Sequence, residues 1–397
     1  MSRRPRVLCL LPGLPLPANR GGALRALSML RALDQNFELS VLAWGREGEN
    51  SAALERLLEG SVQLVRRPAA IDALVEEAAG LAAGLPAGYS RYRWHPVALR
   101  ERLETQGFDV IHFDHPHTAL SWELVRKLQP QAALVLDAHN VEALVVERLA
   151  QSKPLWQRRP LFWQARRIRA LEREIAREMD LVIACSEEDA QAFAAMGARR
   201  VCVVPNGVPP ISPSMVAQRR DLVFVGSFDW RPNTDAAREL AREIWPRCRD
   251  LLPGARLVLV GRNPPPAVVS LAARDVIVTG NVPSVQPFLD RAFATAIPLR
   301  AGSGTRIKIL EAWAARVPVV ACRIAAEGLP CRDGVDLILA EEPGEFARAL
   351  VQLWRDRPLG ERLVAEARRT VAPFTAERVA ATVMRRYHEE LGIGPLL

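Results

Sequence analysis

Short apolar runs rich in valine, isoleucine and leucine recur along the chain, separated by longer segments with helical periodicity. The runs in the first half are RVLCLLP, FELSVLAW, VQLVRRP, FDVIHFD, ALVLDAHN, DLVIACS and RVCVVPNG, and those in the second half are DLVFVGS, ARLVLVG, DVIVTGN, FATAIPL, VPVVACR and DLILAEE. Continuous apolar runs, unlike alternating ones, are typical of strands buried on both faces. Because segments such as ALRALSMLRAL and ALEREIAREM supply helical crossovers, the pattern predicts parallel sheets in doubly wound α/β layers.

One stretch without periodicity divides this pattern in two. Residues 204–220, VPNGVPPISPSMVAQRR, combine several prolines with an Asn-Gly turn, which is typical of a linker. We therefore predict an N-terminal domain over residues 1–205, a linker over 206–220 and a second α/β domain over 221–372. Residues 373–397 contain TAERVAATVMRRYHEEL, an amphipathic helix with no strand after it, which needs a surface to cover. Two domains also suit a chain of 397 residues, which is long for a single core.

The composition is that of a globular protein, with 49% hydrophobic and 25% charged residues. No stretch reaches the roughly 18 consecutive apolar residues that a membrane-spanning helix needs. The N-terminal MSRRPRVLCLLPGLPLP partly resembles a signal peptide, but Pro12 and Gly13 break its short apolar run, so we interpret it as a buried strand. The cysteines form no CxxC pair, which favours core residues in a reducing compartment over disulfides or zinc ligands. They are Cys9, Cys185, Cys202, Cys248, Cys322 and Cys331.

The formal net charge of +8 predicts anionic partners such as nucleotides, diphosphates, nucleic acid or an acidic membrane surface. Residues 153–169, KPLWQRRPLFWQARRIR, hold six cations, three aromatic residues and no acid. This segment could rest on an anionic membrane. A half-packed basic helix explains the same composition equally well. No nucleic-acid reading module is recognisable, so we do not expect nucleic acid as a partner.

Candidate ligand-binding loops directly follow the predicted strands, because open parallel sheets bind ligands beyond the carboxyl ends of their strands. After the first strand, Gly21 and Gly22 precede a helical pattern that starts near Ala23. Glycines let backbone N–H groups approach an anion, and a helix N-terminus favours negative charge. A flexible strand-to-helix turn is the alternative interpretation.

Histidines follow two of the predicted strands. His139, which lies between an aspartate and an asparagine in VLDAHNVEALV, could bond a sugar hydroxyl or a phosphate, relay a proton, or only cap a strand end. The segment IHFDHPH contains His112, His115 and His117, and strand alternation would place the last two on one face. No matching ligand set is apparent, so we predict no metal site.

In the second half, LVFVGSFDWRPNTDAAREL ends a strand at Gly226 and places Arg231 in the following loop, where it could approach a phosphate or be solvated. Asn233 or Thr234 is the expected N-cap of the next helix. A further strand-end loop follows DVIVTG, and it either meets a nucleobase edge with its backbone or forms an ordinary turn. Its residues are Gly280 and Val282.

The segment PLRAGSGTRIKILEAWAARVPVVA, residues 298–321, places a glycine-containing loop before a helical pattern. Gly302, Gly304 and Thr305 form the predicted loop, and the helix is expected from Arg306 to Arg316. Free N–H groups at such a helix start can bind phosphate oxygens. The positions expected to face inward are Ile307, Leu310 and Ala314.

Two cations and one carboxylate stand at the start of this predicted helix. Arg306 can bind a phosphate bidentately, and Lys308 acts as a point charge. The carboxylate of Glu311 can accept hydrogen bonds from two sugar hydroxyls. Basic residues in a first turn oppose the helix dipole unless an anion is present. The pattern therefore favours a diphosphate next to a sugar ring, with solvated side chains as the alternative.

The order of these motifs over almost the whole chain resembles the GT-B glycosyltransferases, specifically glycosyltransferase family 4 and its bacterial exopolysaccharide sugar transferases. The segments that carry the resemblance are GGALR, LDAHNVE, VVPNGV, VGSFDWRPN, VTGNV and GSGTRIKILEAWA with the following PVV. It implies two Rossmann-like domains that face each other across a cleft, with a C-terminal helix that crosses back to the N-terminal domain. The first domain would bind the acceptor and the second the nucleotide-sugar donor.

The resemblance also implies roles for single residues. Glu311 matches the second glutamate of the family's Glu-x7-Glu motif and would hold the ribose, whereas Ser303 stands where the first glutamate is expected. Arg306 lies in the loop whose amides meet the diphosphate. Arg231 lies near the usual phosphate-binding arginine, and Lys308 would replace its missing lysine partner.

His139 resembles the family's cleft histidine, and Gly22 belongs to the glycine loop that touches donor phosphate or acceptor. The implied catalytic residues are His139, Arg231, Arg306 and Lys308, and the implied donor-binding residues are Gly22, Gly226, Gly280, Val282, Ser303, Gly304, Thr305 and Glu311. The resemblance implies a retaining transfer. No DxD sequence occurs, so we expect a metal-independent reaction in which protein cations stabilise the departing diphosphate.

We expect no cofactor beyond the nucleotide-diphosphate sugar as co-substrate. The expected partners are that donor and a glycan or lipid-linked acceptor of cell-surface polysaccharide synthesis. The expected location is the cytoplasm, with peripheral contact to the inner face of the membrane if the basic segment binds there. A non-catalytic nucleotide-sugar-binding protein of the same fold is the alternative, and Ser303 is its best support.

Overall fold

The computed structural model describes residues 3–18, 21–45, 51–66, 70–90, 96–208 and 219–394. The chain divides into two compact units. Unit 1 comprises Met1–Ala18, Gly22–Pro205 and Glu377–Leu397, and unit 2 comprises Asn19–Gly21 and Asn206–Ala376. Most of the predicted linker, residues 209–218, lies outside the described residues.

Unit 1 contains a seven-stranded sheet in the order β3-β2-β1-β4-β5-β6-β7, and its strand pairs are parallel. The strands are β1 (Arg6–Leu11), β2 (Glu38–Gly45), β3 (Ser61–Arg66), β4 (Val110–Asp114), β5 (Ala133–Ala138), β6 (Leu181–Ala184) and β7 (Val201–Val203). Every apolar run predicted as a strand in the first half therefore forms one.

Both faces of this sheet are covered by apolar side chains. In β1, Leu8 and Leu10 belong to one core cluster, whereas Val7 and Cys9 belong to the other. Because successive strand residues point to opposite faces, the two clusters lie on the two sides of the sheet. This is why the strands read as continuous apolar runs, and why the N-terminal run is a buried strand as predicted.

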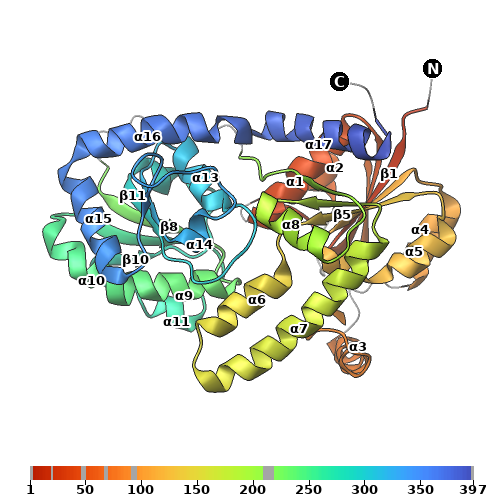
Figure 1. The fold of residues 1–397 in the computed structure, drawn as a ribbon, viewed down its shortest axis with the longest axis horizontal. Helices are drawn as coiled ribbons and strands as arrows, with labels where there is room; N and C mark the ends of the chain where they lie inside the picture. The colour runs from red at the N-terminus through yellow and green to blue at the C-terminus, as the bar shows by residue number, and fades with distance from the viewer. Residues whose placement is uncertain are drawn as a thin grey trace. The chain divides into compact units, whose positions relative to one another are not determined.

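Helices α1 to α8 form the crossovers of unit 1 (Figure 1). They are α1 (Gly21–Asp34), α2 (Ala52–Glu55), α3 (Ala70–Ala82), α4 (Pro96–Thr105), α5 (Trp122–Leu128), α6 (Glu142–Gln151), α7 (Leu155–Glu178) and α8 (Glu187–Ala195), with a short 3-10 helix η2 (Pro116–Ser121) after β4. Helix α1 begins at Gly21, two residues before the predicted start.

The C-terminal helix α17 (Ala376–Leu391) packs onto unit 1, as the crossover prediction requires. Its residues Val379, Val383 and Met384 belong to the same core cluster as β1. Tyr387 is fully buried, packs edge-on against Phe37 and bonds His112 of β4 through its hydroxyl at 2.6 Å. Figure 1 shows this dark-blue helix beside the red N-terminal elements.

Unit 2 contains a six-stranded parallel sheet in the order β10-β9-β8-β11-β12-β13, which repeats the order of the first six strands of unit 1. The strands are β8 (Asp221–Val225), β9 (Arg256–Val260), β10 (Val276–Val278), β11 (Ala292–Ile297), β12 (Val319–Ala321) and β13 (Ile338–Leu339). These also match the predicted runs. The sequence thus predicted both doubly wound sheets.

The helices of unit 2 lie between and after these strands. They are α9 (Arg231–Glu239), the π-helix η3 (Leu240–Ile244), α10 (Trp245–Cys248), the 3-10 helix η4 (Arg249–Leu251), α11 (Pro266–Val269), α12 (Gln286–Asp290), α13 (Ile307–Ala314), α14 (Arg323–Ala326), α15 (Pro343–Arg355), α16 (Arg357–Val371) and the 3-10 helix η5 (Ala372–Phe374).

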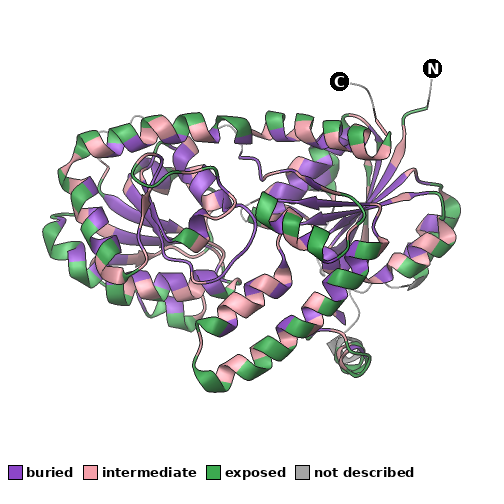
Figure 2. Cartoon of the chain, in the orientation of Figure 1, coloured by how far each residue is buried: buried purple, intermediate pink, exposed green. Residues whose placement is uncertain are grey.

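Burial follows the expected layering in each unit. Figure 2 shows purple, buried strands inside and green, exposed surfaces on the outer sides of the helices. All six cysteines are free. Five of them are buried, as predicted for core residues, whereas Cys331 is half-buried. Among the described residues, no helix is both long enough and apolar enough to span a bilayer.

Candidate active site

Two buried carboxylates lie side by side at the carboxyl edge of the unit 1 sheet. Asp114 ends β4, Asp137 lies near the end of β5, and the parallel register pairs these two residues directly. Both side chains are almost completely excluded from solvent. Buried charges of the same sign require cations next to them, so this pair organises the surrounding side chains.

The cation next to Asp137 is Arg25 of α1. Its Nε lies 2.9 and 3.0 Å from the two carboxylate oxygens, and its Nη1 donates to the carbonyl of Val204 at 2.9 Å. Burial alone would raise the pKa of Asp137, but the Arg25 charge outweighs it and holds the pKa well below its usual value. Asp137 is therefore a fixed anion, and the ion pair ties the first helix to the end of β5.

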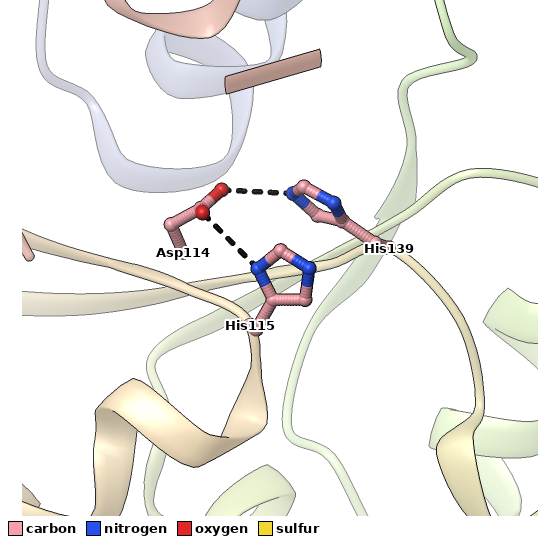
Figure 3. A group of neighbouring side chains, drawn as sticks. All are labelled: Asp114, His115 and His139. Atoms are coloured by element: carbon pink, nitrogen blue, oxygen red, sulfur yellow. Dashed lines mark hydrogen bonds and ion pairs between the residues drawn. The ribbon is translucent and has the colours of Figure 1, made fainter. Parts of the chain in front are cut away.

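Asp114 is shared between two histidines (Figure 3). His139 Nε2 lies 2.8 Å from one carboxylate oxygen, and His115 Nδ1 lies 3.0 Å from the other. Burial alone would lower the pKa of His139, but the carboxylate of Asp114 and then that of Asp137 outweigh it and raise the pKa to about 9. His139 is therefore an imidazolium at neutral pH, with Nε2 donating to Asp114.

The backbone of His115 is strained. Its φ of 79° and ψ of 152° fall in a region that is essentially restricted to glycine and costs roughly 1–3 kcal/mol for other residues. This conformation turns the imidazole back onto the neighbouring Asp114. The ring then lies 3.6 Å from that of His139 and 4.9 Å from that of His117, measured between centroids.

The predicted glycine loop approaches these rings. A side-chain carbon at Gly22 would lie 3.4 Å from Nδ1 of His139 and 3.9 Å from Cε1 of His115. Gly22 thus lets the start of α1, with its free backbone N–H groups, come close to the outward nitrogen of His139. The structure therefore places two predicted site residues, Gly22 and His139, together at the carboxyl edge of unit 1.

In unit 2, Lys308 lies in the first turn of α13 and is half-buried. Its ammonium donates to Oδ1 of Asn233 at 2.6 Å and lies 4.4 Å from the centre of the Phe224 ring. Burial, assisted by the nearby charge of Arg306, lowers the pKa of Lys308 to about 7. An anion bound beside this ammonium would raise that pKa again, because it stabilises the charged form.

Asn233 is held from its other side by the turn after β8. Its amide nitrogen donates to the carbonyl of Ser227 at 2.7 Å, while its oxygen accepts from Lys308. A side-chain carbon at Gly226 would lie only 2.7 Å from the Asn233 amide carbon. Gly226 therefore leaves the space in which Asn233 reaches Lys308.

The loop before α13 is folded tightly upon itself. Arg306 is the N-cap residue, is 6% exposed, and donates through Nη1 to the carbonyl of Ser303. Gly304 has a φ of 72°, a left-handed conformation that favours glycine. Asn206 bonds the Thr305 hydroxyl at 2.8 Å and the Thr305 carbonyl at 3.1 Å. The backbone of this loop is thus fixed before any ligand binds.

The remaining predicted site residues of unit 2 lie at strand ends and helix starts. Glu311 is half-buried on α13, and burial raises its pKa to about 7. Arg231 is exposed and is the first residue of α9. Gly280 has a φ of 69° after β10 with open space around it, and Val282 is half-buried. Among the described contacts, none joins Gly280, Val282 or Arg231 to Lys308.

The comparison with known families identifies the class of protein. Residues 20–210 match the family described as Glycosyltransferase Family 4, and residues 219–356 match the one described as Glycosyl transferases group 1. The chain carries a Glycosyltransferase Family 4 domain followed by a Glycosyl transferases group 1 domain. These matches confirm the resemblance found in the sequence and support a glycosyltransferase enzyme.

Several solved structures share this fold and match nearly the whole length of the glycosyltransferase. Sucrose-phosphate synthase from Thermosynechococcus elongatus has a TM-score of 0.74 at 16% identity, covering 98% of this chain and 100% of its own. HepE from Anabaena, in complex with UDP and glucose, has a TM-score of 0.69 at 15% identity, covering 97% and 100%. TarM has a TM-score of 0.69 at 10% identity, covering 96% and 98%. These likenesses show the GT-B fold. No curated protein sequence matches the chain.

Several local predictions for this glycosyltransferase were wrong. Helix α9 begins at Arg231 with Trp230 as its N-cap, so Arg231 is not a loop residue and neither Asn233 nor Thr234 is the cap. Asn233 bonds Ser227 and Lys308 instead, because tertiary partners compete with the local cap. Likewise, α13 ends at Ala314, and that residue is half-buried rather than inward, since Trp313 fills the interior.

Sequence reasoning on this glycosyltransferase did not identify Asp114, Arg25 or Asn233 as site residues. Arg25 lies in the quoted segment GGALR, among the mostly apolar buried residues of α1. A charged residue among apolar positions is a signal that could have been used, because such a residue is almost always paired. Asp114 gives no comparable signal, since its importance depends on the register between β4 and β5.

The histidine-rich segment was interpreted with the wrong geometry. His115 and His117 lie after the strand rather than on one face of it, because β4 ends at Asp114 and His117 belongs to η2. His112 bonds Tyr387. One group of residues in the described part of this glycosyltransferase could still hold a metal ion. It consists of Asp114, His115 and His139, each offering a ligand atom within 4.8 Å of the others.

Proposed function

We propose that this enzyme is a retaining, metal-independent glycosyltransferase of cell-surface polysaccharide synthesis. It would move a sugar from a nucleoside diphosphate donor to a glycan or lipid-linked acceptor. The observation that carries this proposal is the ammonium of Lys308, which Asn233 and Phe224 hold at the start of α13 beside the loop of Gly304 and Thr305. HepE, which shares the fold, has been solved with UDP-glucose and supports a nucleotide-sugar donor.

Unit 2 would bind the donor. Lys308 and the backbone amides of Gly304 and Thr305 would meet the diphosphate, with Arg231 at the start of α9 as a further cation. Arg306 supports this site indirectly, because its guanidinium bonds the carbonyl of Ser303 within the loop. Glu311 would accept the ribose hydroxyls. Binding as a carboxylate would lower its pKa, because hydroxyl donors stabilise the charged form.

The remaining donor-binding residues would determine the space that is available to the donor. Gly226 and Gly280 leave space at two strand ends, and Val282 follows with a backbone amide and carbonyl for the base. Ser303 replaces the glutamate expected at the donor sugar. Its shorter side chain would change which sugar hydroxyls can be bonded.

Unit 1 would bind the acceptor. The outward Nδ1–H of the imidazolium of His139, beside the amide groups at Gly22, would donate to a sugar hydroxyl or a phosphate oxygen. Asp114 fixes which nitrogen points outward, because it accepts from Nε2. Arg25 and Asp137 hold the end of β5 from which this histidine projects.

In the proposed reaction, the bond between the anomeric carbon and the phosphate oxygen breaks, and its electron pair stays with the departing diphosphate. The acceptor oxygen forms the new bond on the same face, and its proton passes to the departing phosphate. Lys308 and the loop amides stabilise the charge that develops on the leaving oxygen. Because no DxD sequence is present to hold a divalent ion at the diphosphate, these protein groups would take its place.

A binding screen with UDP, GDP and ADP tests this proposal. We expect one nucleoside diphosphate to bind at least ~10-fold more tightly than the others, with one molecule per chain, because a base edge distinguishes donors at the Val282 loop. The matching nucleotide sugar should then release its diphosphate in the presence of EDTA. If no nucleotide binds, or if EDTA abolishes release, the corresponding part of the proposal is wrong.

We also propose peripheral contact of unit 1 with an anionic membrane through the first half of α7. Leu155 and Trp156 are 77% and 76% exposed, and Trp163 is 54% exposed with the Arg167 guanidinium 4.3 Å from its ring centre. Large apolar side chains next to cations are the combination that favours an interfacial helix on anionic lipid.

Liposome co-sedimentation tests the membrane contact. The double variant Trp156→Ser/Trp163→Ser is expected to lose most binding to vesicles that contain anionic phospholipid, because it removes the aromatic anchors but none of the charge. A matched control is Val269→Ser, which removes an exposed apolar side chain from unit 2. Equal sedimentation with neutral and anionic vesicles would contradict the proposal.

A further inference from the structure

The hydrogen-bonded side chains at the carboxyl edge of the unit 1 sheet include three atoms that can bind a metal ion. The proposed sugar transfer does not use these three atoms together. They are a carboxylate oxygen of Asp114, Nδ1 of His115 and Nε2 of His139, and all lie within 4.8 Å of one another (Figure 3). The atoms come from the ends of two adjacent strands, β4 and β5, so the sheet itself fixes their spacing.

The chemistry of this donor set selects a class of ion. Two imidazole nitrogens and one carboxylate are ligands of zinc and of similar divalent transition ions, whereas magnesium and calcium prefer oxygen ligands alone. Three protein ligands leave a fourth position open, as in zinc sites that bind water or substrate. We propose that Asp114, His115 and His139 form a binding site for one divalent transition-metal ion of the zinc class.

The site is organised before an ion arrives. His139 Nε2 and His115 Nδ1 lie 2.8 and 3.0 Å from the two carboxylate oxygens of Asp114, a few tenths of an ångström less than the about 3.3–3.4 Å between neighbouring ligands of a tetrahedral ion with bonds of about 2.0–2.1 Å. The strained backbone at His115 holds its Nδ1 toward Asp114. An ion would therefore replace the protons now shared between the carboxylate and the two rings, with small displacements of the ligands.

Charge and access also suit an ion here. Asp137 lies 3.5 Å from His139 Nε2 and adds a second negative charge, which Arg25 balances and orients. The side chain of His115 is 18% exposed, whereas those of Asp114 and His139 are buried, so an ion would enter past His115. A bound ion would leave Nδ1 of His139 free to donate, so the site does not compete with the proposed role of that histidine.

Cobalt binding to the untagged, full-length protein tests the site. Titration with Co²⁺ is expected to give one ion per chain, with the visible absorption of nitrogen and oxygen ligation. Zn²⁺ should displace it and should raise the melting temperature, because an ion that binds only the folded state stabilises it. Mg²⁺ should do neither.

The variant His115→Gly separates metal binding from folding. Glycine adopts the backbone conformation of His115 without strain, so the variant should fold at least as well as the wild type while losing the ion. His117→Gln is the matched control, because it removes the neighbouring ring and none of the three ligands. Binding that survives in His115→Gly, or that is equally lost in His117→Gln, would overturn the proposal. Neither result bears on nucleotide binding by unit 2.

Discussion

Replacing Lys308 with alanine is expected to lower turnover on the order of 100-fold, the usual effect of removing one preorganised donor from a developing oxyanion. The ammonium is held by Asn233 and Phe224 and needs no reorganisation when the diphosphate departs. The substitution leaves the Asn233–Ser227 hydrogen bond in place, so the melting temperature should change little. Single-turnover release of nucleoside diphosphate from the matching donor measures the effect.

Arg238→Ala is the matched control, because it removes an exposed cation from α9 in the same unit. Its turnover should equal that of the wild type. If Lys308→Ala retains turnover within about twofold, the assignment of Lys308 to the leaving diphosphate is wrong. A loss shared by both variants would instead indicate a general effect of the positive charge of unit 2.

The pH dependence gives a second measurement of the same role. Since the pKa of Lys308 is about 7, the free enzyme loses this charge as the pH rises through that value. The wild-type kcat/KM, which reports groups of the free enzyme, should therefore fall above about pH 7. The kcat/KM of Lys308→Ala should be low at every pH and should not decline above pH 7.

Arg306→Ala should also lower turnover to a similar extent, but through the loop rather than through direct contact. The sequence predicted a phosphate ligand at this position, whereas the guanidinium bonds the carbonyl of Ser303. Without it, the backbone amides of Gly304 and Thr305 would lose part of their fixed orientation. We therefore expect KM for the donor to rise together with the loss of turnover.

The apolar runs predicted all thirteen strands of the described residues, because parallel strands buried on both faces carry their own signal in the sequence. They also predicted which loops follow strand ends, and hence Gly22, His139 and Gly226. The apolar runs could not predict which buried side chains lie next to each other in the site. Asp114 and Asp137 are neighbours only because β4 and β5 are adjacent in the sheet, and an apolar run does not specify its neighbour.

The same limit explains the errors near Asn233 and His115. Asn233 has the chemistry of a helix cap, but its side chain instead donates to the carbonyl of Ser227 and accepts from the ammonium of Lys308. His115 was placed on a strand because the apolar pattern does not mark where β4 ends. The turn after Asp114 requires a backbone conformation that histidine rarely adopts, and no local preference predicts that outcome.

Replacing Arg25 with methionine is expected to destabilise the folded protein by about 3–5 kcal/mol, the range for removing one partner of a buried ion pair. Methionine fills much of the space left by arginine, so the loss would come from the charge of Asp137, which would remain buried next to that of Asp114. Arg25→Lys should recover only part of the stability, because lysine cannot bond both carboxylate oxygens and the Val204 carbonyl together.

Thermal and urea unfolding of the full-length protein, followed by tryptophan fluorescence, measures this effect. The double variant Arg25→Met/Asp137→Asn should be more stable than Arg25→Met alone, because the uncompensated charge is then absent. Arg3→Met is the matched control, since it breaks an exposed ion pair with Asp109 and should change stability by less than about 1 kcal/mol. If Arg25→Met unfolds like this control, the pair does not hold α1 to β5, and the fixed position of His139 needs another cause.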